Sequence, residues 1–129
     1  GIFGRGRTLE EAFEETARAM FNLMAKLESV DSREQFKFEC SAGDLGSLLV
    51  EMLNELLAIR DIEGVFFSDL RLSPIERSPD GCSLKGFAIG ERMDLAKHEV
   101  GMEVKAATYF GLKVEREDGS YIAQCVLDV

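Results

Sequence analysis

The strongest constraint on the fold is a change of periodicity along the chain. Two segments place apolar residues every three or four positions, which is the spacing of one face of an α-helix. Most of the remaining chain alternates apolar and polar residues in steps of two, which is typical of β-strands that bury one face. The sequence therefore predicts an α+β fold, with two main helices packed on a mostly antiparallel β-sheet.

The first helix is expected to begin after Thr8. Glu11 follows three residues later, which is the spacing of a capping box that bonds the free amide groups of a helix start. Asp44 is expected to open the second helix in the same manner, and that helix should end before residues 61–64. The apolar stripes comprise Leu9, Ala12, Phe13, Thr16, Met20, Met24 and Leu27 in the first helix, and Leu45, Leu48, Leu49, Met52, Leu53, Leu56 and Leu57 in the second.

Turn sequences separate the predicted strands. Asp-Gly pairs at 80–81 and 118–119 are favoured in tight hairpins, so the strands on either side of each pair are expected to run antiparallel. Strands are expected at residues 36–40, 65–72, 82–90, 103–109, 112–117 and 121–128, with a further short strand at 2–5.

Composition limits the class of protein. The chain has 129 residues, 46% hydrophobic and 30% charged, which predicts one domain spanning residues 1–129. No apolar stretch approaches membrane-spanning length and the first residues lack the apolar centre of a secretory signal, so a cytoplasmic protein without a membrane partner is expected. The net charge of −9 repels phosphates, which argues against direct, tight nucleic-acid binding. Cys40, Cys82 and Cys125 form no zinc-binding pair and are expected to be buried as small apolar residues.

Two apparent catalytic motifs are weak. Residues 1–8 (GIFGRGRT) approach a phosphate-binding loop, but Arg7 replaces its lysine, so nucleotide binding is not predicted. Gly4 and Gly6 are expected instead to let a strand turn sharply into the first helix. His98 is the sole histidine and lacks a nucleophile motif, so we expect an exposed loop residue or a local hydrogen-bond partner and no catalysis by this chain.

Asp128 is the candidate site residue. It follows an apolar strand and lies next to Val129, whose terminal carboxylate would be a second anion if the chain ends there. Two oxygen-rich anions so close favour a hard divalent cation, Ca²⁺ or Mg²⁺. The two residues supply only about three oxygens and Ca²⁺ takes about six to eight, so another carboxylate must come from elsewhere. The alternative is a frayed strand end with a solvated aspartate.

Four stretches resemble the archease family, in the family's order and over essentially the whole chain. They are GRTLEEAFEETARAMFNLM (6–24), DLGSLLVEMLNELL (44–57), EVKAATYFGLKV (103–114) and CVLDV (125–129). The resemblance implies a noncatalytic activator of the RNA-splicing ligase RtcB, which promotes ligase guanylylation and multiple turnover in tRNA splicing. It also implies a divalent metal cofactor, Ca²⁺ by preference, with Asp128 and Val129 as the metal ligands that this chain carries.

Two departures from the family pattern affect the site. Archeases usually carry an Asp-His-Thr-Ala-Asp-type stretch that runs into the Gly-Ile seen here as Gly1 and Ile2, and its last aspartate, a third metal ligand, would fall two positions ahead of Gly1. Phe110 stands where the family commonly has histidine. Two other functions remain open: a chaperone-like modulator of tRNA-modifying enzymes, which the family also suggests, and a metal-dependent hydrolase that uses His98 as its base.

Overall fold

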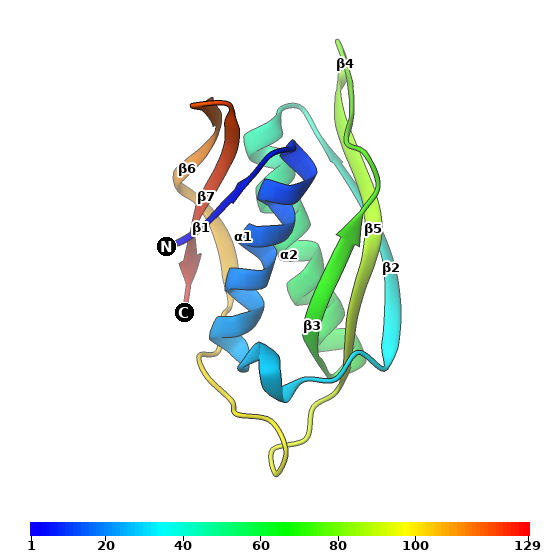
Figure 1. The fold of residues 1–129 in the computed structure, drawn as a ribbon. Coiled ribbons are helices and arrows are strands. Elements are labelled where there is room, and N and C mark those ends of the chain that lie inside the picture. Colours follow the sequence, from blue (N-terminus) through cyan, green and yellow to red (C-terminus); the bar gives the residue numbers. More distant parts are fainter.

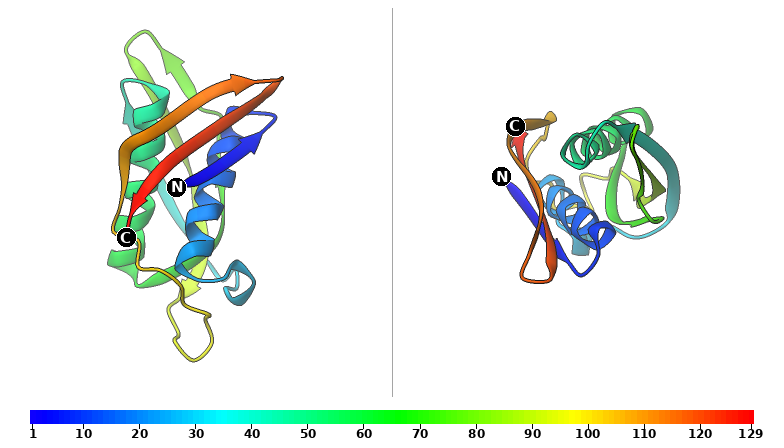
Figure 2. Two further views of the ribbon diagram at one scale, coloured as in Figure 1. Left: turned by 90° about the vertical axis from the view of Figure 1, so that its left-hand side faces the viewer. Right: turned by 90° about the horizontal axis from the view of Figure 1, so that it is seen from above.

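The computed structural model describes residues 1–129 and places two helices between two antiparallel sheets (Figures 1 and 2). The elements are β1 (Ile2–Gly6), α1 (Leu9–Met24), the short 3-10 helix η1 (Leu27–Ser29), β2 (Glu34–Ala42), α2 (Leu45–Glu63), β3 (Val65–Leu72), β4 (Glu76–Ser78), β5 (Gly81–Arg92), β6 (Ala106–Glu117) and β7 (Ser120–Asp128).

The strands are divided over two sheets. One has the order β1-β7-β6, and the other has the order β2-β5-β3 with β4 also paired to β5. Every strand pair is antiparallel, so the predicted α+β class is confirmed. The helices are apolar over more than one face, and each packs against both sheets. A single sheet would leave part of that apolar surface exposed, which explains why there are two sheets where one was expected.

The predicted helix starts are confirmed in atomic detail. The Thr8 hydroxyl accepts a hydrogen bond from the Glu11 amide at 3.1 Å, and the Asp44 carboxylate accepts one from the Ser47 amide at 2.8 Å. The predicted end of the second helix is too early, because α2 continues to Glu63 and stops at Gly64 in the left-handed conformation, with φ of 64°. The last turn of α2 is mostly polar and exposed, so the weakening of the apolar stripe there marks a change of exposure and not the helix end.

The strand predictions hold with one exception, and the three-residue strand β4 was not predicted. The Asp118-Gly119 hairpin joins β6 to β7, with φ of 51° and 80°, and the turn before Gly81 joins β4 to β5. The two strands expected at 103–109 and 112–117 are instead one strand, β6, which starts only at Ala106 and is interrupted by a bulge between Thr108 and Lys113. Residues 109–112 form that bulge, so a local break in alternation does not end the strand.

The glycines of β1 serve close packing. Residues 2–6 form a strand and not a phosphate-binding loop, and neither Gly4 nor Gly6 has a positive φ. A Cβ atom on Gly4 would lie inside van der Waals contact with the Ala12 carbonyl oxygen and the Thr16 hydroxyl, and one on Gly6 would meet Glu11. The two glycines therefore allow β1 to lie directly on α1, and the sharp turn expected from them is not their role.

The three cysteines differ in how deeply they are buried. Cys82 and Cys125 are buried, as predicted, whereas Cys40 is half-buried, and burial raises its thiol pKa to about 12. Neither helix is both long enough and apolar enough to cross a membrane.

Candidate functional site

The C-terminal end of β7 lies beside the N-terminal end of β1. β7 is the central strand of its sheet, with Ile2 of β1 opposite Cys125 and Ala106 of β6 opposite Asp128. Both chain ends are therefore on the same side of the molecule, as Figures 1 and 2 show. The sequence predicted both strands but could not show that they are neighbours.

The backbone at Asp128 is held and its side chain is free. The Asp128 carbonyl oxygen accepts a hydrogen bond from the Lys105 amide at 2.7 Å, so β6 and the preceding loop hold the strand to its last residue. Asp128 is an exposed residue, and Val129 is 60% exposed. The tip therefore presents oxygen atoms to solvent from a fixed main chain.

The tip supplies only part of a metal site. No group of three or more histidine, cysteine, aspartate or glutamate side chains is arranged to hold a metal ion. Asp128 offers one carboxylate and Val129 offers a main-chain oxygen, which suit a hard cation but do not reach the about six to eight oxygens that Ca²⁺ takes. A cation at this tip would need further ligands from outside the described residues.

His98 is buried, so its predicted exposed position is wrong. Its side chain is fully inaccessible and meets the Phe66 ring edge-on, with 5.3 Å between the ring centroids. The Asp94 amide donates to His98 Nδ1 at 3.0 Å, which leaves the proton on Nε2, and Nε2 lies 3.0 Å from Glu91 Oε2. The alternative expectation, a local hydrogen-bond partner, is correct.

Glu91 is the centre of an ionic cluster around His98. The Asp31 amide donates to Glu91 at 2.6 Å, Lys97 Nζ lies 2.8 Å from the same carboxylate, and Arg33 Nε lies at 3.2 Å. These contacts, led by the Asp31 amide and then by Lys97 and His98, lower the pKa of Glu91 to about 2. No nucleophile lies among these residues, so the arrangement fixes the loop after β5 and offers no hydrolytic pair.

Two polar residues of α2 support the other end of that loop. The buried Arg60 donates to the Val104 carbonyl oxygen at 2.7 Å, and Asn54 exchanges two hydrogen bonds with the backbone of Ala107 at 2.8 and 3.2 Å. These bonds hold the backbone on both sides of Lys105, whose amide bonds Asp128. The sequence analysis did not single out either residue, although a polar side chain within an apolar stripe was the available signal.

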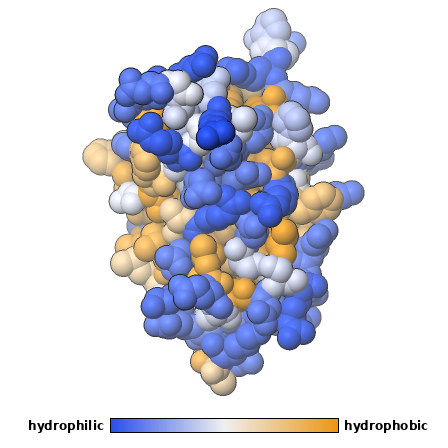
Figure 3. All heavy atoms as spheres, viewed as in Figure 1, coloured by the Kyte–Doolittle hydropathy of each residue, from blue (hydrophilic) through white to orange (hydrophobic).

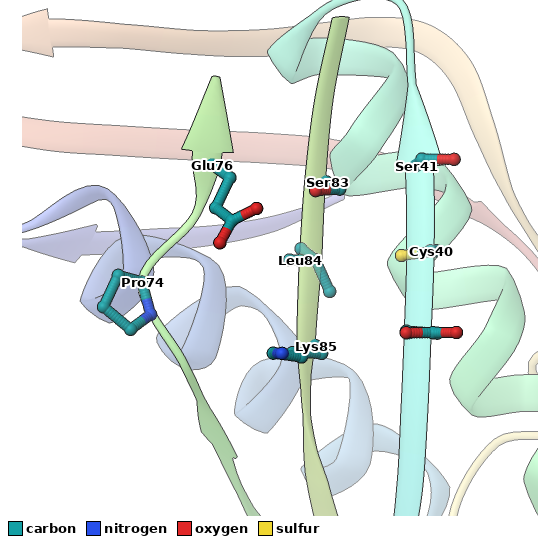
Figure 4. Close-up of a pocket in the computed structure, with 8 residues that line it drawn as sticks. Cys40, Ser41, Pro74, Glu76, Ser83, Leu84 and Lys85 are labelled. Atoms are coloured by element: carbon teal, nitrogen blue, oxygen red, sulfur yellow. The ribbon is translucent and has the colours of Figure 1, made fainter. Parts of the chain in front are cut away.

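The other surface depressions carry no comparable chemistry. One of them lies on the β2-β5-β3 sheet and is lined by two glutamates, one lysine, two serines and apolar atoms (Figure 4). It is shallow and open, and it contains no histidine. Its lining residues are Glu39, Cys40, Ser41, Pro74, Glu76, Ser83, Leu84 and Lys85.

Comparison with known proteins agrees with this architecture. A model of the Archease protein family matches residues 1–129. The chain belongs to the archease family. It is 45% identical to an archease of Pyrococcus abyssi and 43% identical to one of Thermococcus gammatolerans, in each case over 100% of this chain and 91% of the relative.

Two solved structures share the fold. The solution structure of a Methanobacterium thermoautotrophicum protein superimposes with a TM-score of 0.81 at 36% identity and covers 98% of this chain and 89% of that protein. The crystal structure of a Thermotoga maritima archease, described as a possible chaperone, gives a TM-score of 0.57 at 19% identity and covers 98% of this chain and 87% of that one. The archease fold is therefore established for residues 1–129.

Proposed function

We propose that this archease is a noncatalytic cofactor of the RNA-splicing ligase RtcB. In this proposal it promotes guanylylation of the ligase and its multiple turnover in tRNA splicing, while the ligase performs the chemistry. A divalent cation, Ca²⁺ by preference, is bound at the tip formed by Asp128 and Val129.

The register between β1 and β7 carries the metal part of the proposal. Ile2 pairs with Cys125 and Gly4 with Ala123, so each step backward along β1 is a step forward along β7. Continued pairing would place a residue two positions ahead of Gly1 directly opposite Asp128. That is the position at which archeases usually carry the further ligand aspartate. Residues opposite each other in an antiparallel pair have Cβ atoms about 4.5 to 5.5 Å apart, close enough for two carboxylates to share one cation.

The rest of the molecule is compatible with a role beside another enzyme. The His98 cluster lacks a nucleophile. The tip is exposed, and the hydrogen bond from the Lys105 amide holds its main chain. The net charge of −9 favours association with a basic protein such as an RNA-handling enzyme and disfavours competition for the RNA itself.

Substitution of Asp128 by asparagine tests the cation site. We expect Asp128→Asn to weaken Ca²⁺ binding and to reduce guanylylated ligase by about tenfold or more, because a charged ligand is replaced by a neutral one of the same shape. The measurements are calorimetric titration with Ca²⁺ and gel quantification of ligase labelled with radioactive GTP. Asp118→Asn is the matched control, because Asp118 lies in an exposed turn with φ of 51°, which asparagine tolerates. Full stimulation by a folded Asp128→Asn variant would exclude the cation mechanism.

A chaperone-like role is the second candidate. Ten large apolar side chains are exposed, among them Ile62 at 80%, Leu95 at 79% and Phe110 at 79%. Exposed apolar surface is what a client-binding protein would use, and the Thermotoga maritima relative is described as a possible chaperone. Protection of an aggregating tRNA-modifying enzyme, unaffected by Asp128→Asn, would support this function over the first.

A further inference from the structure

We propose that β2 pairs with β2 of a second copy of this chain, in an antiparallel register centred on Phe38, to form a two-fold symmetric dimer. The inference does not depend on the proposed function. It concerns a strand on the opposite side of the molecule from the C-terminus (Figure 1). It gives a partner to a strand edge that the rest of the chain leaves uncovered.

The outer edge of β2 is unpaired along its whole length. β2 is the outer strand of its sheet and pairs only with β5, over nine residues and without a register shift from Glu34 to Ala42. It forms the right-hand margin of the molecule in Figure 1. Alternate amide and carbonyl groups of such a strand point away from the sheet. No group of the protein outside β5 forms a hydrogen bond with residues 34–42, so this edge can accept another strand.

The other outer strands are short or are protected by helix side chains. Glu14 of α1 accepts a hydrogen bond from the Leu72 amide at the end of β3, at 2.9 Å. Asn54 of α2 exchanges two hydrogen bonds with the backbone of Ala107 in β6, and the β6 bulge interrupts that edge further. β1 has only five residues. Such devices prevent strand edges from pairing with other chains, so their absence from β2 points to a partner strand.

The side chains of β2 are self-complementary about Phe38, the middle residue of the strand. Phe38 is 4% exposed and faces the helices, so alternation places Lys37 and Glu39 on the outer face, where both are exposed. In an antiparallel pair centred on Phe38, Lys37 of each copy stands opposite Glu39 of the other, and two-fold symmetry makes this pair twice. On the inner face, Phe36 of each copy stands opposite Cys40 of the other.

Charge selects this register over its neighbours. A slide of two residues is the smallest that keeps the inner faces of the two copies on the same side. In one direction it places Lys37 opposite Lys37, and in the other it places Glu39 opposite Glu39; like charges directly opposite each other are destabilising. Neither side chain forms an ion pair within the chain, and Lys37 contacts only the Phe87 ring, at 6.0 Å from its centroid. Both charges are therefore available to a second copy.

The acidic character of the chain limits the strength of this dimer. Burial, and then the charges of Glu51 and Glu55 of α2, raise the pKa of the Cys40 thiol to about 12, so these carboxylates lie near the same edge. Their copies and the net charge of −9 oppose association. Figure 3 shows hydrophilic and hydrophobic atoms side by side along the right-hand margin, without a continuous apolar patch. We therefore expect a reversible dimer whose population depends on concentration.

Sedimentation equilibrium with charge-reversed variants tests the pairing. The apparent mass of the unmodified chain should rise from 14.3 kDa toward twice that value as its concentration increases. We expect Lys37→Glu and Glu39→Lys each to weaken the dimer about tenfold or more, because each places two like-charged pairs across the symmetry axis. An equimolar mixture of the two variants should recover the dimer, because every opposed pair in the mixed dimer again has opposite charges.

Lys113→Glu and Glu115→Lys are the matched controls. They make the same changes in net charge at an ion pair of β6 whose side chains are 44% and 45% exposed, and dimerisation should stay within about twofold of that of the unmodified chain. Circular dichroism verifies that each variant is folded.

Three outcomes would overturn the inference. An unmodified chain that stays monomeric overturns self-pairing and leaves the edge to a strand of another protein. Dimers of Lys37→Glu and Glu39→Lys that are as stable as the unmodified dimer place the interface elsewhere. Variants that dissociate and do not recover on mixing overturn the register about Phe38.

Discussion

At the scale of single residues, the least expected feature is the buried His98 beside Glu91. The histidine accepts a hydrogen bond from the Asp94 amide and faces a carboxylate that also accepts the Asp31 amide. A buried polar side chain is tolerated when it is paired in this way. The cluster fastens the loop between β5 and β6 at one end, while Arg60 fastens it at the other.

The lowered pKa of Glu91 predicts a pH-dependent contribution to stability. Its folded-state pKa is about 2 and its ordinary value is 4.5, so the ionised form is favoured by folding. The stabilisation is complete above pH 4.5 and is lost as the pH falls toward about 2. Glu91→Gln should therefore have a lower free energy of unfolding than the unmodified chain at pH 7, and the difference should shrink below pH 4.5.

Urea denaturation at a series of pH values measures this difference. Glu115→Gln is the control, because Glu115 is 45% exposed and pairs only with Lys113 on its own strand. The free energy of unfolding of Glu115→Gln should differ little from that of the unmodified chain at every pH. If Glu91→Gln lowers the free energy of unfolding by the same amount at pH 7 and at pH 3, the lowered pKa of Glu91 is refuted.

At the scale of elements, the contact between β1 and α1 determines where the chain's first residues lie. The strand crosses the helix with glycines at two of its inward positions, and the helix backbone at Ala12 fills the space that side chains would need. This close approach holds β1 in place as the neighbour of β7. The candidate cation site therefore depends on a packing contact that contains no site residue.

Replacement of Gly4 by alanine should disturb that contact. The added methyl group would overlap the Ala12 carbonyl oxygen and the Thr16 hydroxyl, and overpacking of this kind costs about 1 to 3 kcal/mol of unfolding free energy. Gly43→Ala is the matched control, because its methyl group would meet nothing within 4 Å and its φ is not positive. Chemical denaturation of both variants compares them, and equal stability of the two would show that β1 can shift away from α1 without cost.

At the scale of the whole molecule, the excess of acidic residues is the main determinant of long-range behaviour. The 24 aspartate and glutamate residues outnumber the 15 lysine and arginine residues. Such a charge accelerates encounter with a basic partner and repels nucleic acid, and both effects are weakened by salt. Both effects suit the proposed role beside an RNA-handling enzyme.

The rate of association with the proposed ligase partner should therefore depend strongly on ionic strength. We expect the association rate constant to fall by about tenfold or more between low and high salt, with a smaller change in the dissociation rate constant. Stopped-flow mixing at several salt concentrations measures both constants. Phe110→Ala changes no charge and should show the same salt dependence of association, and an association rate independent of salt would contradict electrostatic steering.

The types of the helices and strands, and most of their limits, follow from local sequence patterns. The caps at Thr8 and Asp44 and the Asp118-Gly119 hairpin depend on residues within a few positions of one another, so local pattern was sufficient to predict them. The candidate site residues Asp128 and Val129 were also selected from the sequence, and their metal binding remains a prediction.

Which helices and strands are neighbours depends on packing between distant parts of the chain. The division into two sheets, the burial of His98 and the pairing of β1 with β7 depend on contacts between residues far apart in the chain. The outward bulge at Phe110 likewise depends on Gln124 of the next strand. Alternation of apolar and polar residues in steps of two indicates that a strand has one buried face. It does not indicate which layer covers that face or which strand pairs with it.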